Sequence, residues 1–395
     1  MRSYFWVECL TKFSNVALIA YSEILLKSDV VRKRLEDLLV KQIRLRLKLD
    51  GLNFWRIRKE GGRIYILGEN PEEICRSVLK VFGVDFSAPA LETETGQETI
   101  VENSLKLAEK ILGENESFAV RARRVGKHPY TSKDLEVKIG STILKKLGES
   151  KSLKVNLENP DKTIFVEARE KKAYIYSKIF RGWGGLPVGS QGRLLIFLGN
   201  NVKTALAGWL MMKRGVFPIP FYLNQTNKDE EDFRFAKTLK DYISQPNLKV
   251  YVAPFKKILD FIPQNINSNL KTLLIQRLAV KVGCKLANLK KALGIVLGVS
   301  LDPKPTQTLR LLSYLEDAST LPIFHPLIGF EKKEIEDLRL KLNFPENLTK
   351  KTFFDFSPPE NYNGITGEKL KNFEEKIGVE KLVEKIVNEV KVVKL

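Results

Sequence analysis

One strand–loop–helix unit near the middle of the chain constrains the fold most. Residues 193–198 read Arg-Leu-Leu-Ile-Phe-Leu, an apolar run of the length expected for a strand buried on both faces. The tight loop Gly-Asn-Asn-Val-Lys-Thr at 199–204 follows, and the apolar segment 205–215, which ends in glycine, predicts a helix. In α/β sheets such a loop is the usual place for a nucleotide phosphate, because the amides of the helix N-terminus face it. If this loop binds a phosphate, the chain is expected to be an enzyme; if it does not, a binding protein is expected.

The pattern of this unit repeats through the rest of the chain. Further apolar strand candidates, with helical stretches between most of them, lie at 216–222, 248–252, 294–297 and 321–324. This alternation predicts a doubly wound, Rossmann-like parallel sheet of the α/β class for residues 188–395. The end of that domain, 369–395, is charged and amphipathic, and we expect one surface helix there.

The first half of the chain belongs to a different class, mixed α+β. Short strands and helices alternate in residues 1–80, which predicts a ferredoxin-like domain. Its expected elements are a strand at 16–21, a basic helix at 30–49, and a hairpin of strands 54–58 and 63–67 joined by Gly61-Gly62.

Residues 81–182 predict a second α+β domain. Its expected elements are a helix at 104–112, a strand at 118–124, a helix that follows the capping box of Thr131 and Asp134, and strands at 163–167 and 173–176. The run Gly-Trp-Gly-Gly-Leu-Pro at 182–187 is rich in turn residues, so we place a domain boundary there.

The charge balance favours a polyanionic partner. Lysines and arginines number 66 against 47 aspartates and glutamates, a formal net charge of +19 to which both halves of the chain contribute. A basic surface on every domain suits nucleic acid. A thermophile surface rich in lysine and glutamate is the alternative.

Scarce residue types exclude several kinds of site. Cys9, Cys75 and Cys284 lie far apart without Cys-x-x-Cys spacing, which argues against a zinc site, an iron–sulfur cluster or disulfides and for a reducing cytosol. With two histidines, His128 and His325, we expect no Ser-His-Asp triad and no metal site. No stretch approaches the roughly 20 apolar residues that cross a bilayer, so we expect a cytoplasmic protein without membrane contact.

Two groups of basic residues predict where nucleic acid binds. Arginine side chains match phosphate oxygens in pairs, and a nearby helix N-terminus adds amide donors. The first group is Lys27, Arg32, Lys33 and Arg34, and the second is Arg121, Arg123, Arg124, Lys127, His128 and Lys133. An ordinary solvated face is the alternative for both groups.

Six segments resemble the tRNA 4-thiouridine synthetase (ThiI) family, in the same order. They are Tyr-Ser-Glu-Ile-Leu-Leu-Lys at 21–27, Phe-Ala-Val-Arg-Ala-Arg-Arg at 118–124, Val-Asn-Leu-Glu-Asn-Pro-Asp at 155–161, Gly-Gly-Leu-Pro-Val-Gly at 184–189, Trp-Leu-Met-Met-Lys-Arg-Gly at 209–215 and His-Pro-Leu-Ile-Gly-Phe-Glu-Lys at 325–332. The second of them is similar to the family's THUMP-domain signature. Each segment is short, but their order and spacing from Tyr21 to Pro359 make the resemblance specific.

The resemblance implies a ferredoxin-like domain at 1–80, a THUMP domain at 81–182 and a PP-loop ATPase domain at 188–395. In that family the PP-loop, Ser-Gly-Gly-x-Asp-Ser, binds ATP while a uridine of tRNA is adenylated, and a cysteine then carries the sulfur that displaces AMP. The two N-terminal domains hold the acceptor end of tRNA. Because the two basic groups fall in those domains, we expect them to bind tRNA.

The loop departs from the PP-loop position by position. Gly199, Asn200 and Asn201 replace Ser-Gly-Gly, and Lys203 and Thr204 replace Asp-Ser. Two asparagines add side chains where paired glycines let a phosphate approach the backbone, and the lysine reverses the local charge. The loop is not a Walker A motif either. A lysine beside a helix N-terminus leaves an anion site of some other kind as an alternative.

Other nucleotide contacts of the family are partly kept. Arg277 aligns with the family's nucleotide-contacting arginine and Gly298 with the glycine of its Thr-Gly-Glu segment; for Arg277 a solvated helix arginine is the alternative. The residual nucleotide site that the resemblance implies is Phe197, Leu198, Gly199, Asn200, Asn201, Lys203, Thr204, Arg277 and Gly298.

The cysteine that carries sulfur in the family has no counterpart. The corresponding segment, 352–359, contains none, and Asp355 is the nearest residue to its position. Cys284 lies on an expected helix, where we interpret it as a small buried apolar residue.

We therefore expect a tRNA-binding protein with a degenerate PP-loop and no catalytic residue. It would be a non-catalytic scaffold or the partner of another tRNA-modifying enzyme, and a homodimer. We expect no cofactor, except ATP if the rebuilt loop still binds phosphate. The alternatives are an active ATP-dependent sulfurtransferase that makes 4-thiouridine, and an adaptor whose basic surface binds an acidic protein.

Overall fold

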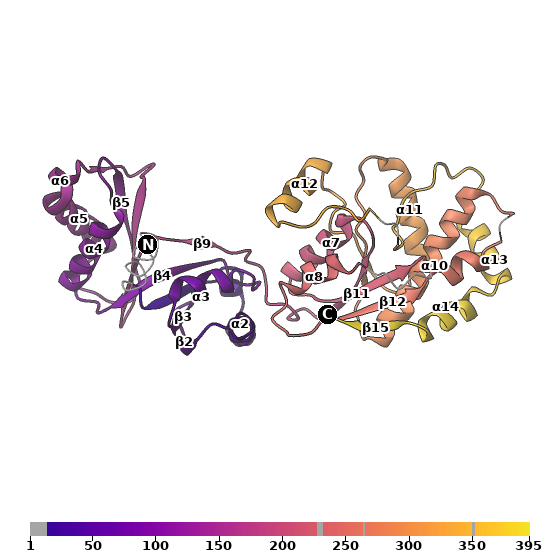
Figure 1. Ribbon diagram of the computed structural model, residues 1–395, viewed down its shortest axis with the longest axis horizontal. Helices are drawn as coiled ribbons and strands as arrows, with labels where there is room; N and C mark the ends of the chain where they lie inside the picture. Colours follow the sequence, from indigo (N-terminus) through magenta and orange to yellow (C-terminus); the bar gives the residue numbers. More distant parts are fainter. Residues whose placement is uncertain (1–13, 227–231, 264, 350–351) are drawn as a thin grey trace, which may run out of the picture. The chain divides into compact units, whose positions relative to one another are not determined.

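The computed structural model describes residues 14–226, 232–263, 265–349 and 352–395, so Cys9 lies outside the described residues. The chain divides into two compact units, an N-terminal unit that ends at Gly185 and a C-terminal unit that begins at Leu186 (Figure 1). Among the helices of the described segments, none combines the length and the apolar content needed to cross a bilayer.

The N-terminal unit is built on one sheet of order β2-β3-β1-β4-β8-β7-β5-β6, with β9 paired to β4. Its strands are β1 (Val16–Ala20), β2 (Phe54–Glu60), β3 (Arg63–Gly68), β4 (Phe86–Thr93), β5 (Ser117–Arg124), β6 (Lys154–Val155), β7 (Lys162–Ala168), β8 (Ala173–Tyr176) and β9 (Phe180–Arg181). Its helices are η1 (Glu23–Leu26), α2 (Asp29–Leu49), α3 (Pro71–Val78), α4 (Gln97–Ile111), α5 (Ser132–Ile143), η2 (Leu144–Gly148) and α6 (Glu149–Lys151).

Strand β4 belongs to both halves of this unit. Its residues 86–90 pair with β1, in the half expected to be ferredoxin-like, and its residues 91–93 pair with β8, in the half expected to be a THUMP domain. The two halves therefore share a backbone ladder. The domain boundary that we placed near residue 80 stays a prediction.

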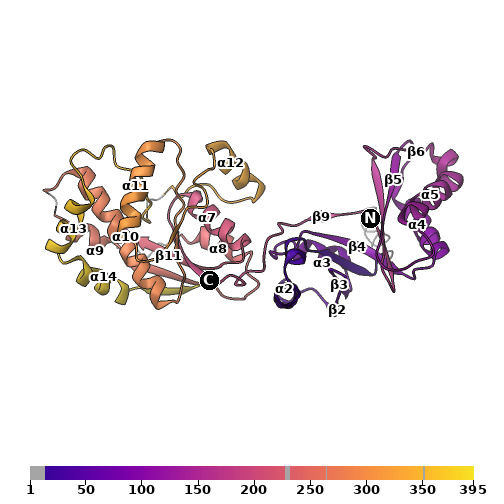
Figure 2. The same cartoon turned by 180° about the vertical axis from the view of Figure 1, so that it is seen from behind.

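Local sequence explains the main elements of the unit. Gly61 and Gly62 adopt positive φ angles of 54° and 78°, which a two-residue hairpin turn requires, and they join β2 to β3 as predicted. The predicted capping box is confirmed, since Thr131 accepts from the amide of Asp134 and Asp134 accepts from the amide of Thr131. Helix α5, which it starts, lies with α4 on one face of the sheet at β5 (Figures 1 and 2).

A buried ion cluster ties β3 to β7. Glu167 of β7 is 4% exposed and accepts hydrogen bonds from Arg63 at 3.0 Å, from Tyr176 at 3.2 Å and from Arg169. Arg169 also donates to the carbonyl oxygen of Gly61 at 3.0 Å, so the cluster holds the hairpin turn. Burial alone would raise the pKa of the Glu167 carboxyl, but the two arginines outweigh it and lower that pKa.

The C-terminal unit has a sheet of order β14-β13-β10-β11-β12-β15. Its strands are β10 (Arg193–Leu198), β11 (Phe217–Asn224), β12 (Lys249–Pro254), β13 (Ile295–Val296), β14 (Ile323–Phe324) and β15 (Lys391–Lys394). Its helices are α7 (Val202–Lys213), α8 (Arg234–Lys240), α9 (Lys256–Phe261), α10 (Ser268–Leu289), α11 (Pro305–Ala318), α12 (Lys332–Lys341), α13 (Gly367–Lys376) and α14 (Val379–Asn388). All pairings among β10 to β14 are parallel, which confirms the predicted doubly wound class.

Helices cover both faces of this sheet. On one face α10 packs against β10 and β13, with α11, α13 and α14 around it, and together they enclose the main apolar core (Figure 1). On the other face α7 packs against β10 and β11, and Gly208 of α7 lies close to Ile196 of β10 and Leu239 of α8. The carboxyl-terminal ends of β10, at 198, and of β13, at 296, thus lie at the same end of the parallel sheet, and the loop 199–201 follows β10 there.

One prediction for this unit was wrong. Instead of one surface helix at 369–395, the chain forms α13, turns at Gly378 with a positive φ of 70°, and forms α14 and then β15. The last strand reads Lys-Val-Val-Lys and pairs antiparallel with β12. It covers an edge that would otherwise leave backbone groups unpaired, so tertiary pairing overrides helix propensity there.

Candidate nucleotide and RNA sites

Side chains of the loop between β10 and α7 form hydrogen bonds within the loop itself. Asn201 caps α7, its Oδ1 accepting from the amide of Lys203 at 2.9 Å. The Thr204 hydroxyl accepts from the amide of Gly199 at 3.2 Å and donates to the carbonyl oxygen of Asn201 at 2.7 Å. The backbone amides of Asn200 and Asn201 donate instead to a residue outside the loop.

The side-chain carboxylate of Asp355 accepts hydrogen bonds from those amides. The amide of Asn200 donates to both oxygens of Asp355 at 3.0 and 3.1 Å, and the amide of Asn201 donates to Oδ1 at 3.4 Å. The side-chain amide of Asn200 donates to Oδ2 at 3.1 Å. Burial raises the pKa of the Asp355 carboxyl, and these hydrogen bonds oppose that shift without cancelling it.

Asn200 also holds the segment that carries Asp355. Its Oδ1 accepts from the amide of Phe353 at 3.1 Å, and its Nδ2 donates to the carbonyl oxygen of the same residue. The amide of Phe354 donates to the carbonyl oxygen of Leu223 at 3.0 Å, so the segment continues along the end of β11. Asn200, which from the sequence was expected to obstruct a phosphate, therefore links the loop to the segment that carries Asp355.

Next to this contact lies a cavity of about 430 Å³. Its lining residues are Phe197, Leu198, Gly199, Asn201, Lys203, Thr204, Gly298, Val299, Ser300, Asp302, Pro303, Lys304, Thr308, Phe354, Asp355, Phe356, Ser357 and Pro358. The ammonium of Lys203 donates to the hydroxyl of Ser300 at 2.7 Å. Burial lowers the pKa of Lys203, against the attraction of Asp302.

Most residues of the predicted nucleotide site meet at this cavity. Phe197, Leu198, Gly199, Asn201, Lys203, Thr204 and Gly298 line it, whereas Asn200 is 7% exposed and takes part through its backbone and the segment 353–355. At Gly298 a Cβ atom would lie 2.5 Å from the backbone nitrogen and Cα of Thr204, so this glycine lets the segment just after β13 approach the first turn of α7.

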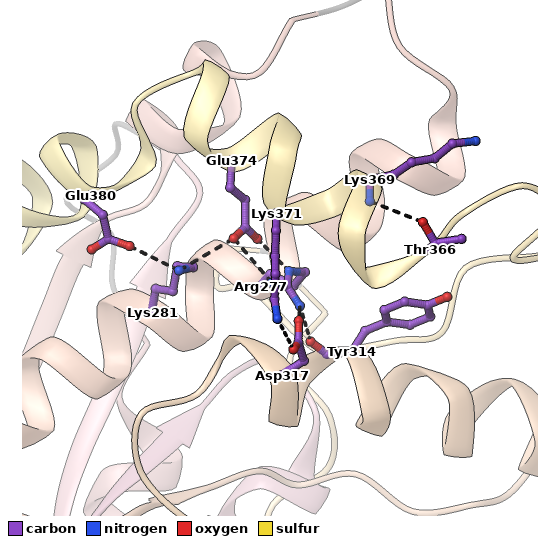
Figure 3. A network of polar contacts seen from close by, with 9 residues as sticks. All are labelled: Arg277, Lys281, Tyr314, Asp317, Thr366, Lys369, Lys371, Glu374 and Glu380. Atoms are coloured by element: carbon purple, nitrogen blue, oxygen red, sulfur yellow. Dashed lines mark hydrogen bonds and ion pairs between the residues drawn. The ribbon is translucent and has the colours of Figure 1, made fainter.

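The structure does not bring Arg277 to the cavity. It lies in α10, is 1% exposed, and donates to Glu374 of α13 at 2.5 Å, to Asp317 of α11 at 2.9 Å and to the carbonyl oxygen of Tyr314 at 2.7 Å (Figure 3). The alternative of a solvated helix arginine is wrong, because carboxylates of two other helices bury the guanidinium. Here it ties α13 to the core of the unit.

Several cavity residues escaped the sequence analysis. Ser300, Asp302 and Lys304 lie between β13 and α11, and Thr308 lies in the first turn of α11; nothing in their local sequence marks them as site residues. Asp355 was noted only as the residue nearest to the missing cysteine, and its approach to the loop joins positions 155 residues apart. Neither cysteine of the described segments lines the cavity, since Cys75 and Cys284 are buried elsewhere.

The basic residues predicted to bind tRNA lie on the N-terminal unit. Within the described segments, the side chains of Lys27, Lys33, Arg34, Arg123 and Lys127 are exposed and make no side-chain hydrogen bond or ion pair. The others have local partners. Arg32 pairs with Asp29 at 2.5 Å and Lys133 with Glu136 at 3.6 Å. Arg121 donates to the carbonyl oxygen of Leu157, Arg124 donates to the carbonyl oxygen of His128 at 3.5 Å, and Nε2 of His128 lies 3.2 Å from the carbonyl oxygen of Val125. Asp29, Val125 and Leu157 are exposed and Glu136 and His128 are partly exposed, and such surface contacts cost little to replace with a phosphate.

Comparison with known proteins gives a consistent result for all three parts of the chain. Residues 189–347 match the family described as Thiamine biosynthesis protein (ThiI), residues 95–178 match the THUMP domain, and residues 16–87 match the ThiI ferredoxin-like domain. A probable tRNA sulfurtransferase of Methanosarcina mazei is 32% identical over 97% of this chain and 96% of its own length. A protein of the same name from Thermococcus kodakarensis is 33% identical over 83% of this chain and 87% of its own length.

Two solved structures share the architecture. The crystal structure of PH1313 from Pyrococcus horikoshii Ot3 is 28% identical, with a TM-score of 0.64 over 84% of this chain and 100% of that one. A 4-thiouridine synthetase–RNA complex with bound ATP has a TM-score of 0.77 over 97% of this chain and 100% of that one. At 21% identity the second likeness concerns the fold alone.

Proposed function

This chain belongs to the ThiI family of tRNA sulfurtransferases, and we propose that it binds tRNA but has lost ATP-dependent adenylation and sulfur transfer. Its role is then that of a non-catalytic scaffold, or of a partner for a separate tRNA-modifying enzyme in the cytoplasm. We also propose that it is a homodimer, which light scattering after gel filtration tests.

One observation supports the loss of ATP use most directly. The carboxylate of Asp355 accepts hydrogen bonds from the two loop amides that would face a phosphate at this position. A bound triphosphate would have to displace a partly buried carboxylate of like charge. The missing thiol supports the loss of sulfur transfer, because no cysteine of the described segments reaches the cavity.

Retained tRNA binding is supported by the other unit. The relatives are named as tRNA sulfurtransferases, and the chain keeps the THUMP domain with exposed cations on β5 and after it. Arginine and lysine on exposed strands and loops suit phosphate contacts that need no nucleotide cofactor. We propose that these residues contact the acceptor end of tRNA.

Calorimetric titration of ATP into the purified chain, with and without tRNA, tests this function. We expect no ATP binding tighter than about 1 mM in either case, and tRNA binding that is unchanged by ATP. Submicromolar ATP affinity that depends on tRNA would contradict the proposal.

A second candidate function is an active sulfurtransferase with a rebuilt loop. The open cavity of about 430 Å³, with Lys203 and Lys304 among its lining residues, favours it. It requires 4-thiouridine to form when the chain is incubated with tRNA, ATP and a sulfur donor. Nucleoside analysis of that tRNA by mass spectrometry separates the two candidates.

Replacing Arg121, Arg123 and Arg124 together with alanine is expected to weaken tRNA binding at least about tenfold. If each arginine contacts one phosphate, the dependence of log K on log salt should become less steep by about 2 to 3. Filter binding at several salt concentrations measures both quantities.

A matched control removes the same charge from the other unit. Lys376, Lys381 and Lys385 are exposed on α13 and α14 or at their ends, and their triple alanine variant is expected to bind tRNA as the wild type does. Equal weakening by both variants would favour an adaptor that binds any polyanion through net charge alone.

A further inference from the structure

We propose that Asp355 is an intramolecular competitor for an anion site: its carboxylate holds the loop amides that an external diphosphate group would need. This inference rests on the proposed loss of ATP use and adds what keeps the site closed. It concerns one residue, so a single substitution should reopen the site.

The contact has the geometry of a bound anion. Asn200 and Asn201 present two backbone amides and one side-chain amide to the two carboxylate oxygens, at 3.0 to 3.4 Å. These donors lie directly before the first turn of α7, where the helix dipole also favours negative charge. Asp355 therefore satisfies the requirements that a phosphate oxygen would satisfy.

Aromatic side chains fix the segment that carries Asp355. Phe353 packs on Tyr222 with ring centroids 4.3 Å apart, and Phe356 packs on Phe197 at 5.3 Å. The buried Gln276 of α10 donates to the carbonyl oxygen of Ser357 at 2.6 Å. With anchors on both sides, the carboxylate has a high effective concentration at the loop, and an external anion must compete against it.

Gly199 makes this approach possible. A Cβ atom at this position would overlap the Asp355 carboxylate and would lie 2.7 Å from the carbonyl oxygen of Phe354. Only a residue without a Cβ atom fits at position 199 beside Asp355 and Phe354, which indicates that the loop and this segment are complementary in shape.

The space beside Asp355 suits a diphosphate once the side chain is removed. The carboxylate lines the cavity of about 430 Å³, so its loss joins that cavity to the freed amides. Lys203, whose ammonium lies 2.7 Å from the Ser300 hydroxyl, supplies a cation on the same cavity. The competing ligand class is therefore an inorganic or nucleoside diphosphate group.

Titration of inorganic diphosphate into the full chain tests the inference. We expect no measurable binding to the wild type and at least about tenfold tighter binding to Asp355→Ala. Adding Lys203→Met to that variant should remove most of the gain. Asp302→Ala is the matched control, because it removes a carboxylate from the same cavity that is not bonded to the loop amides, and it should gain nothing.

Folding is checked on each variant by circular dichroism and by tRNA affinity, and Asp355→Ser serves if the alanine variant fails to fold. A folded Asp355 variant that binds no diphosphate overturns the inference and leaves the proposed function standing. Equal gains from Asp302→Ala and Asp355→Ala overturn it too, because net charge would then explain the gain. ATP-dependent thiolation by the wild type would instead overturn the proposed function.

Discussion

Replacing Arg277 with methionine is expected to lower the free energy of unfolding of the C-terminal unit by about 3 to 5 kcal/mol. Arg277 is 1% exposed and Glu374 is 5% exposed, so the change leaves a buried carboxylate without its main partner. Lys281 remains 3.6 Å from Glu374 and compensates only in part. Asp317 loses less, because it is a third exposed and keeps Lys371 at 2.6 Å (Figure 3).

Hydrogen exchange of the full chain, followed by mass spectrometry, measures this loss locally. Peptides from α10 and α13 should exchange roughly a hundredfold faster or more. The double variant Arg277→Met/Glu374→Met should recover most of the protection, because it removes both charges and keeps apolar volume. Lys281→Met is the matched control on the same helix and should change little. If the single variant exchanges as slowly as the wild type, the ion pair does not stabilise the unit.

Glu167→Gln is expected to cost the N-terminal unit about 3 kcal/mol or more. The substitution keeps the shape of the side chain but leaves the buried guanidinium groups of Arg63 and Arg169 without a counter-charge. The same two arginines donate to the carbonyl oxygens of Gly62 and Gly61, so the turn between β2 and β3 should also lose protection from hydrogen exchange.

The pH dependence gives an independent readout of the same cluster. Because the pKa of Glu167 is lower in the folded chain, its stabilisation is present above the ordinary value near 4.5 and is lost as the pH falls below it. Urea unfolding should show a smaller loss of stability on acidification for Glu167→Gln than for the wild type. Glu170→Gln, an exposed neighbour, should behave as the wild type. Equal acid sensitivity of all three chains would show that Glu167 does not carry the effect.

Particular elements show how far the sequence could be interpreted. The hairpin at Gly61-Gly62 and the capping box at Thr131 were predictable because the decisive residues are neighbours in the chain. The parallel strands β10 to β14 were predictable because each is a short apolar run between helices. The C-terminal strand was not, because β15 depends on an open edge at β12, and its four residues alone do not determine a conformation.

The candidate site shows the same division. The substitutions in the loop 199–204 could be identified from the sequence, but their consequence could not. Asn200 was expected to obstruct a phosphate, whereas it bridges to Phe353, and Arg277 was expected at a nucleotide or in solvent, whereas it binds Glu374 across 97 positions.

The order of residues by itself determined the three-part architecture, the basic character of the N-terminal unit and the absence of a cysteine from 352–359. Those properties follow from local periodicity and residue type, which are fixed within some ten to twenty neighbouring positions. Only the tertiary structure decided that the carboxylate of Asp355 occupies the amides of Asn200 and Asn201. The two segments, 155 positions apart, contact each other there because β10 and β11 end at the same carboxyl-terminal end of a parallel sheet. No local pattern in either segment predicts this contact.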